Sequence, residues 1–281
     1  MKNFKEVVMG KVFLLAACVS VVMVMMICGF LFVKGLPTMM EIGVKDFLLG
    51  TRWKPGIDVY GILPMILGSI YVTAGALVIG VPIGILMAVF MAKFCPERIY
   101  RILKPIVDLL AGIPSIVYGF FGLVVLVPFV REHFTGDGQS IFCASILLGI
   151  MILPTVIGTS EPAIRAVEKS FYEGALALGA THERSVFTVI LPAAKSGIFA
   201  AIVLGVGRAL GETMAVMMIV GNQPRVPNSM FQGVRTLTTN IVLEMGYATD
   251  LHREALIATG VVLFIFILII NMSFSLLKRK S

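Results

Sequence analysis

Six apolar runs, each long enough to cross a lipid bilayer, constrain this chain more than any other feature of its sequence. They cover residues 12–33, 63–92, 106–130, 141–160, 197–221 and 255–277. A spanning α-helix needs about 20 mainly apolar residues. Charged residues make up 14% of the chain, whereas a soluble domain carries about a quarter. The sequence therefore predicts an all-α membrane protein with six transmembrane helices in the lipid bilayer.

The basic residues that flank these runs indicate how the chain is oriented. Lys and Arg collect on the cytoplasmic side of membrane spans, and more of them flank the inner ends of the runs when the N-terminus is placed inside. We therefore expect both termini to be cytoplasmic. The first run is longer than the roughly 7–15 apolar residues of a secretory signal, so we expect it to be retained as the first span.

The net charge and the cysteines give no indication of a nucleic-acid-binding site or a metal site. The net charge of +7 is explained by residues that flank the spans, so we expect no nucleic-acid partner. We expect the cysteines to be reduced thiols that act as small apolar side chains, with no metal site, because they lie in or beside apolar runs without metal-ligand spacing. They are Cys18, Cys28, Cys95 and Cys143.

Two longer segments are predicted on the outer side. The first contains Trp53 and Tyr60, and because these residue types favour the membrane–water interface, we expect interfacial anchors rather than a binding site. The second contains an apolar, Thr-rich stretch at residues 231–243. That stretch is too short to span a membrane, so we expect a re-entrant or interfacial helix.

The polar segment at residues 161–196 lies between the fourth and fifth apolar runs. Helix-forming residues dominate its first part, and a second helical stretch runs from about His182 to Ile190. Gly179 separates the two parts and suits a helix C-terminus or a tight turn. Pro192 marks the approach to the next span. The segment is predicted to form a helix–turn–helix at the cytoplasmic face.

The spacing in this segment resembles the loop motif of binding-protein-dependent transport permeases, which reads Glu-Ala-Ala, Gly four residues later, and then Ile-x-Leu-Pro. The positions that match are Glu173, Ala175, Gly179, Leu191 and Pro192. Gly174 replaces the middle Ala and Val189 replaces the Ile. The resemblance implies that residues 161–196 form a coupling loop that docks on a separate ATPase subunit.

Other short segments resemble the phosphate-specific members of that family, the PstC type. They are GILP at 61–64, GIPS at 112–115, GRALGET at 207–213 and RTLT at 235–238. The resemblance implies a type I ABC importer permease fold. Residues 1–61 would hold the first transmembrane helix and an outer segment, and residues 62–281 the permease core.

The same resemblance implies a multi-subunit importer in the bacterial plasma (inner) membrane. This chain contains no GxxxxGK[ST] phosphate-binding loop, so ATP and Mg²⁺ would be used by a separate ATP-binding subunit dimer, with no cofactor in this chain. A related permease of the PstA type would complete a heterodimer. A phosphate-binding protein would deliver inorganic phosphate on the outer side.

Arg208 and Glu212 are charged residues within the fifth apolar run. Charges within a span are costly and usually face the bundle interior. The two residues are four apart, so they are predicted to share one helix face with Thr213 nearby. A guanidinium matches the geometry of a tetrahedral oxyanion, so we assign all three to the substrate path. Glu212 would neutralise Arg208, accept a proton or repel wrong anions, and a purely structural salt bridge is the alternative.

Three other functions remain as alternatives. A permease for molybdate or sulfate would use the same charge pair. An ion-coupled secondary transporter would be expected to show internal repeats or several membrane carboxylates; we find no repeat and one clear acid within a run. An intramembrane enzyme is disfavoured because no HExxH or GxSxG motif is present. We therefore expect no catalytic residues.

Overall fold

The computed structural model describes residues 4–280, and the side chains of residues 6–273. In chain order its helices are α1 (Phe4–Ile42), α2 (Val44–Leu49), α3 (Leu63–Val89), α4 (Glu97–Gly112), α5 (Ser115–Phe121), α6 (Val127–His133), α7 (Ile141–Arg165), α8 (Lys169–Ala177), α9 (His182–Ser185), α10 (Leu191–Ala193), α11 (Lys195–Gly211), α12 (Met214–Ile219), α13 (Leu237–Glu244) and α14 (Asp250–Lys280). Three π-helical turns are η2 (Phe90–Phe94), η3 (Gly122–Leu126) and η4 (Val186–Ile190), and η1 (Pro55–Ile57) is a 3₁₀ turn. Strands β1 (Trp53–Lys54) and β2 (Val59–Tyr60) pair antiparallel.

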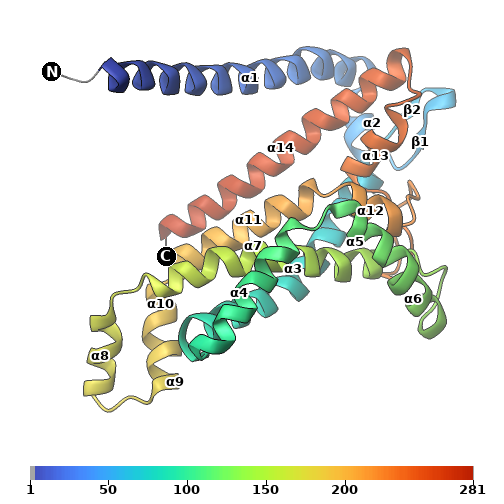
Figure 1. Ribbon diagram of the computed structural model, residues 1–281. Helices are drawn as coiled ribbons and strands as arrows, with labels where there is room; N and C mark the ends of the chain where they lie inside the picture. The colour runs from blue at the N-terminus through green and yellow to red at the C-terminus, as the bar shows by residue number, and fades with distance from the viewer. Residues whose placement is uncertain (1–3, 281) are drawn as a thin grey trace.

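The centre of the bundle is the pair α3 and α7, with α11 alongside (Figure 1). Glycines let α3 approach α7 closely. A Cβ added at Gly80 would lie 2.6 Å from the carbonyl oxygen of Gly149, and one at Gly75 would lie 2.2 Å from Ser145 Oγ. Small residues at helix contacts are typical of membrane bundles, where close packing replaces the hydrophobic effect. These sites therefore do not tolerate larger side chains without movement of a helix.

The predicted spans correspond to helices of the structure. Within the described residues, five helices are long and apolar enough to cross a membrane, and a sixth span results if the pair His182–Ala193 and Lys195–Gly211, bent by 69°, is taken as one. The predicted run at 197–221 covers most of α11 and all of α12, with a break between them. The all-α membrane fold predicted from the sequence is confirmed.

The third predicted run, at 106–130, requires a correction because it is divided. α4 ends at Gly112, and α5 begins at Ser115. Pro114 disfavours a helical conformation in the residue before it, and Ile113 is extended with φ −69° and ψ 125°. The apolar stretch that qualifies as a span is therefore Ser115–His133.

The long helices α1 and α14 meet near one end and diverge toward the other (Figure 1). They touch where Gly35 faces Ala258 and Val261, and the rings of Phe32 and Phe264 meet edge to face, 5.9 Å apart. Most apolar side chains of α1 are exposed. Such exposure on a helix of this length fits a surface in contact with lipid acyl chains.

The two ends of the bundle differ. One end carries α8 and α9, and the first turns of α1 and the last turns of α14 lie toward this end (Figure 1). The other end carries α2, the β1–β2 hairpin and α13. There, Phe47, Ile62 and Met65 pack in one buried cluster with Leu237 and Leu256. The segment that precedes α3 is thus packed against the rest of the bundle.

Candidate translocation site and coupling segment

Arg208 lies in the last turn of α11 and is half-buried. Its Nη1 atom donates a hydrogen bond to Thr155 Oγ1 on α7 at 3.1 Å. This is the one hydrogen bond of Arg208 within the described part of the chain. A guanidinium has five N–H donors, so most of its donor capacity is not used by the protein. Thr155 was not predicted from the sequence as a site residue, because the only indication is a hydroxyl group within the fourth apolar run.

The surface beside Arg208 is open. A Cβ added at Gly207 or at Gly211 would meet no atom within 4 Å, and Leu204, one turn earlier, is 54% exposed. Residues four apart share a helix face, so Leu204 and Arg208 lie on the same side of α11. The guanidinium therefore borders a strip of α11 that this chain does not cover.

The prediction that Glu212 shares a helix face with Arg208 was wrong. α11 ends at Gly211, and Glu212 is extended, with φ −68° and ψ 128°. Its Oε1 atom accepts hydrogen bonds from the backbone N–H groups of Thr213 at 3.2 Å and Ala215 at 3.3 Å. The first N–H groups of a helix lack partners within it, and the Glu212 carboxylate bonds to one of them, that of Ala215, and to the N–H of Thr213, which directly precedes α12. No ion pair joins Arg208 to Glu212 among the described residues.

The break between α11 and α12 is held by hydrogen bonds of two threonines. Thr213 donates through Oγ1 to the carbonyl oxygen of Gly211 at 3.1 Å. Thr238, at the start of α13, donates to the carbonyl oxygen of Glu212 at 3.2 Å. A cavity of about 10 Å³ beside Glu212 is lined in part by Ser69 and Thr236, which is about the space of one water molecule at most. Thr238 of the 235–238 motif thus supports the break, and the Thr236 hydroxyl lies 3.0 Å from that of Thr238.

The predicted helix–turn–helix is present, formed by α8, α9 and η4. We call residues 169–193, from α8 to α10, the coupling segment after their predicted role; residues 161–165 belong to α7. Gly179 has φ +85°, a conformation that residues with a Cβ rarely adopt, so the predicted turn is confirmed. The Tyr172 hydroxyl lies 2.7 Å from His182 Nδ1 across the turn. Leu178, at the tip, is 91% exposed.

The motif residues of this segment are spread along it. Glu173 is exposed and Ala175 half-buried on α8, while Leu191 and Pro192 begin α10. Leu191 packs with the buried side chains of the neighbouring η4 turn. The structure thus places two of the five on α8, one at the turn and two near the base of α11.

The end of the bundle that carries α13 contains a buried polar cluster around Glu244, which is 6% exposed. Trp53 donates through Nε1 to Glu244 Oε2 at 2.8 Å, and His252 Nε2 lies 2.8 Å from the same oxygen. Arg235 donates to Glu244 Oε1 and, at 3.0 Å, to Asn240 Oδ1. The prediction of Trp53 as an interfacial anchor was therefore wrong: it is 5% exposed and ties β1 to α13.

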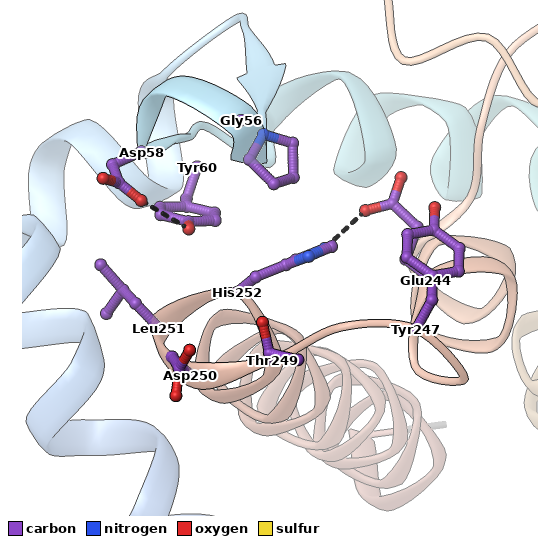
Figure 2. Close-up of a pocket in the computed structure, with 10 residues that line it drawn as sticks. Gly56, Asp58, Tyr60, Glu244, Tyr247, Thr249, Asp250, Leu251 and His252 are labelled. Carbon is purple, nitrogen blue, oxygen red and sulfur yellow. Dashed lines mark hydrogen bonds and ion pairs between the residues drawn. The ribbon is translucent and has the colours of Figure 1, made fainter.

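A cavity of about 490 Å³ opens next to this cluster. Figure 2 shows His252 directed toward Glu244, and the Tyr60 hydroxyl directed toward Asp58. The Tyr60 hydroxyl donates to Asp58 Oδ1 at 3.0 Å. Burial and this hydrogen bond raise the pKa of Tyr60 to about 12. Tyr60 therefore remains a neutral donor at physiological pH.

The pKa of Glu244 gives a testable pH dependence. Burial opposes its ionisation, but the hydrogen bonds from Trp53, His252 and Arg235 outweigh burial and hold the pKa of Glu244 below 4.5. A depressed carboxyl pKa stabilises the folded state above the unfolded pKa, and this stabilisation is lost as pH falls through the folded pKa. We expect the melting temperature of the purified protein to fall more steeply below pH 4.5 than that of Glu244→Gln.

At neutral pH Glu244→Gln is expected to be destabilised by about 3 kcal/mol or more, because it leaves Arg235 buried without its carboxylate. Glu132→Gln, at an exposed carboxylate, is the control and should follow the wild type at every pH. Parallel melting curves for the wild type and Glu244→Gln below pH 4.5 would contradict an ionised Glu244.

Three comparisons with known proteins bear on these features. Residues 80–281 match the family described as "Binding-protein-dependent transport system inner membrane component". The chain is 42% identical over 253 residues to the probable ABC transporter permease protein YqgH of Bacillus subtilis, covering 86% of this chain and 82% of that protein. It is 36% identical over 240 residues to the phosphate transport system permease protein PstC of Haemophilus influenzae, covering 78% of this chain and 76% of that protein.

The fold is also similar to a solved structure. A bacterial alginate ABC transporter, crystallised in complex with an alginate pentasaccharide-bound periplasmic protein, contains a chain that superposes with a TM-score of 0.68. The alignment covers 100% of this chain and 98% of that one, at 14% sequence identity. At this identity the comparison supports the arrangement of helices and nothing more specific.

Proposed function

Because the chain belongs to the family of binding-protein-dependent transport system inner membrane components, we propose that it is the membrane-spanning permease subunit of an ATP-driven importer of inorganic phosphate. Its similarity to proteins named phosphate transport system permease protein PstC supports this substrate. The family places the chain in the inner membrane as a multi-pass protein.

Arg208 is the structural observation that carries the proposal. It is a cation in the last turn of a largely apolar helix, held by one hydrogen bond from Nη1 to Thr155. Thr155 fixes one edge of the guanidinium, and the other N–H groups are available for the oxygens of a phosphate ion. Guanidinium and phosphate oxygens match in two-point geometry. We infer that phosphate passes along the open strip of α11 and contacts Arg208 on the way.

Glu212 and Thr213 have a different proposed role from the one that their spacing suggests. The Glu212 carboxylate accepts hydrogen bonds from the N–H groups of Thr213 and Ala215 at the start of α12, and the Thr213 hydroxyl donates to the carbonyl oxygen of Gly211. We propose that both residues keep the α11–α12 break in place beside the path, so that the N–H donors of Arg208 face the passing anion.

The remaining partners follow from the family and the coupling segment. We propose that the exposed tip of α8 and α9, with Leu178 at its end, docks on an ATPase subunit in the cytoplasm, which places both termini on the cytoplasmic side. A second permease of the PstA type covers the open strip of α11, and a phosphate-binding protein docks at the outer end. Closure of the ATPase dimer would then move the helices as near-rigid bodies.

Transport by the reconstituted complex tests this function. The chain is co-purified with its second permease and ATPase, placed in proteoliposomes and supplied with the binding protein. We expect accumulation of radiolabelled phosphate only with ATP, and at least tenfold slower uptake of sulfate and molybdate at equal concentration. If sulfate or molybdate were taken up faster than phosphate, that anion would be identified as the substrate in place of phosphate. Equal phosphate uptake without ATP would contradict an ATP-driven importer.

A further inference from the structure

A buried carboxylate joins two helices at the end of the bundle that carries α8. Glu161, one turn before the end of α7, is 2% exposed. Tyr100 on α4 donates its hydroxyl hydrogen to Glu161 Oε1 at 3.2 Å, and Lys104 Nζ lies 3.7 Å from Oε2. Arg165, one turn further along α7, donates through Nε to the same carboxylate. Buried charges persist only when they are paired and hydrogen-bonded, so these contacts hold α4 against α7.

Arg165 extends the cluster to a third element. Its Nη2 atom donates to the carbonyl oxygen of Met91 in η2 at 2.7 Å. Its guanidinium carbon lies 4.3 Å from the centre of the Tyr100 ring, within the range of a cation–π contact. The π-helical turn that ends α3 is therefore tied to the same point as α4 and α7. We call Glu161, Arg165, Tyr100 and Lys104 the Glu161 cluster.

The Glu161 cluster lies between the coupling segment and the candidate path. α7 ends at Arg165 and α8 begins at Lys169, so the cluster directly precedes the coupling segment. Along α7 in the other direction, Thr155 lies six residues before Glu161, or about 9 Å at 1.5 Å per residue. One helix thus carries both the partner of Arg208 and the buried carboxylate.

A second series of contacts leads through α4. The break after α4 is bridged by Tyr118, whose hydroxyl donates to the carbonyl oxygen of Leu110 at 2.9 Å. On α5, a Cβ added at Gly119 would lie 2.9 Å from the Cα atom of Ala215 on α12. Since α12 begins directly after the break at Glu212, contacts run from the Glu161 cluster through α4 and α5 to the candidate path.

We propose that Glu161 is a positioning residue for ATP-driven transport, whose buried carboxylate makes α4 follow the movement of the coupling segment. This inference rests on the proposed function, in which an ATPase moves that segment. Glu161→Gln keeps the shape of the side chain and removes its charge, which weakens the contacts with Lys104 and Arg165. The apolar contact between Val107 on α4 and Ile157 on α7 remains, but the ionic link is weakened, and α4 no longer follows the movement of the coupling segment closely.

Coupling efficiency in proteoliposomes tests the proposal. We expect Glu161→Gln to lower the number of phosphate ions taken up per ATP hydrolysed at least fivefold. The apparent KM for phosphate should change less than twofold, because Glu161 does not contact the path. Asp108→Asn is the matched control: Asp108 also pairs with Lys104, at 3.6 Å, but is 61% exposed, and its ratio should stay within twofold of the wild type. A wild-type ratio in Glu161→Gln would overturn the proposal.

Hydrogen–deuterium exchange of the same complex provides a measurement that does not depend on the transported ion. In the wild type we expect ATP to change the protection of both the α8–α9 region and α4, residues 97–112. In Glu161→Gln the change should persist at α8–α9 and disappear at α4. An equal response of α4 in both proteins, or none in the wild type, would overturn the proposal. If the wild-type complex itself took up no phosphate, that result would refute the proposed substrate instead.

Discussion

Replacing Arg208 with Gln is expected to reduce ATP-driven phosphate uptake at least about 30-fold, while the amount of protein in the membrane stays at the wild-type level. Truncating one partner of a desolvated charge-assisted contact costs about 2–5 kcal/mol, and each 1.36 kcal/mol corresponds to about tenfold. Gln keeps a polar head but is too short to replace Nη1 in the hydrogen bond to Thr155, so the expected loss combines the charge offered to phosphate with this contact. Initial uptake rates in proteoliposomes measure the effect.

Two further variants separate charge from position. Arg253→Gln removes a positive charge from an exposed residue of α14 and should leave uptake within twofold of the wild type. Thr155→Val keeps the guanidinium but removes the acceptor of its hydrogen bond, and we expect a smaller loss than in Arg208→Gln. Normal uptake by Arg208→Gln would show that the guanidinium is structural and that phosphate takes another route.

Replacing Gly179 with Asp is expected to reduce phosphate uptake at least tenfold and to lower the yield of co-purified ATPase subunit. A Cβ at this position meets no atom within 4 Å, so the effect does not come from a clash. It comes from the backbone and from charge: φ is +85°, which a residue with a Cβ adopts less readily than Gly, and the variant places a carboxylate at the exposed turn. Relief of that strain reorients the tip of α8 and α9. Co-purification and uptake rates measure the two effects.

Gly174→Ala is the matched control for this variant. Gly174 lies in α8, is exposed, and has open space for a Cβ. Ala is more favourable than Gly in a helix by about 1 kcal/mol, so this variant should keep or improve the yield of complex. If Gly179→Asp retained the ATPase at wild-type yield and transported phosphate at the wild-type rate, the segment would not be the site of coupling.

Much of the fold follows from hydropathy alone. Long apolar runs form helices because a bilayer core offers no partner for an unpaired backbone N–H or C=O group, so their length and composition predict spans directly. The turn at Gly179 was predicted for a comparable reason, since a glycine between two helical stretches is the residue that accepts a positive φ. Both features depend on local chemistry, and the structure has the turn and most of the spans at the predicted places. The third run is the exception, because the break at Ile113 moves its span to Ser115–His133.

The candidate site was predicted less completely. Arg208 was identified as a candidate because it is a charged residue within an apolar run. Its predicted pairing with Glu212 depended on the assumption that one continuous helix contains both residues. Because α11 ends at Gly211, Glu212 does not share a helix face with Arg208, and its carboxylate instead accepts a hydrogen bond from the first turn of α12. Periodicity within one helix cannot reveal such a break, because Thr238, from a later segment, helps to hold it.

The sequence by itself determined that this chain is a helical membrane protein with a polar turn between two spans and a cation inside one of them. Only the tertiary structure decided which side chain each charge meets. Arg208 meets Thr155, Glu161 meets Tyr100 and Lys104, and Trp53 meets Glu244. The first kind of property depends on the free energy of each segment in lipid, which composition determines. The second depends on contacts between residues far apart in the chain, which neither composition nor spacing specifies.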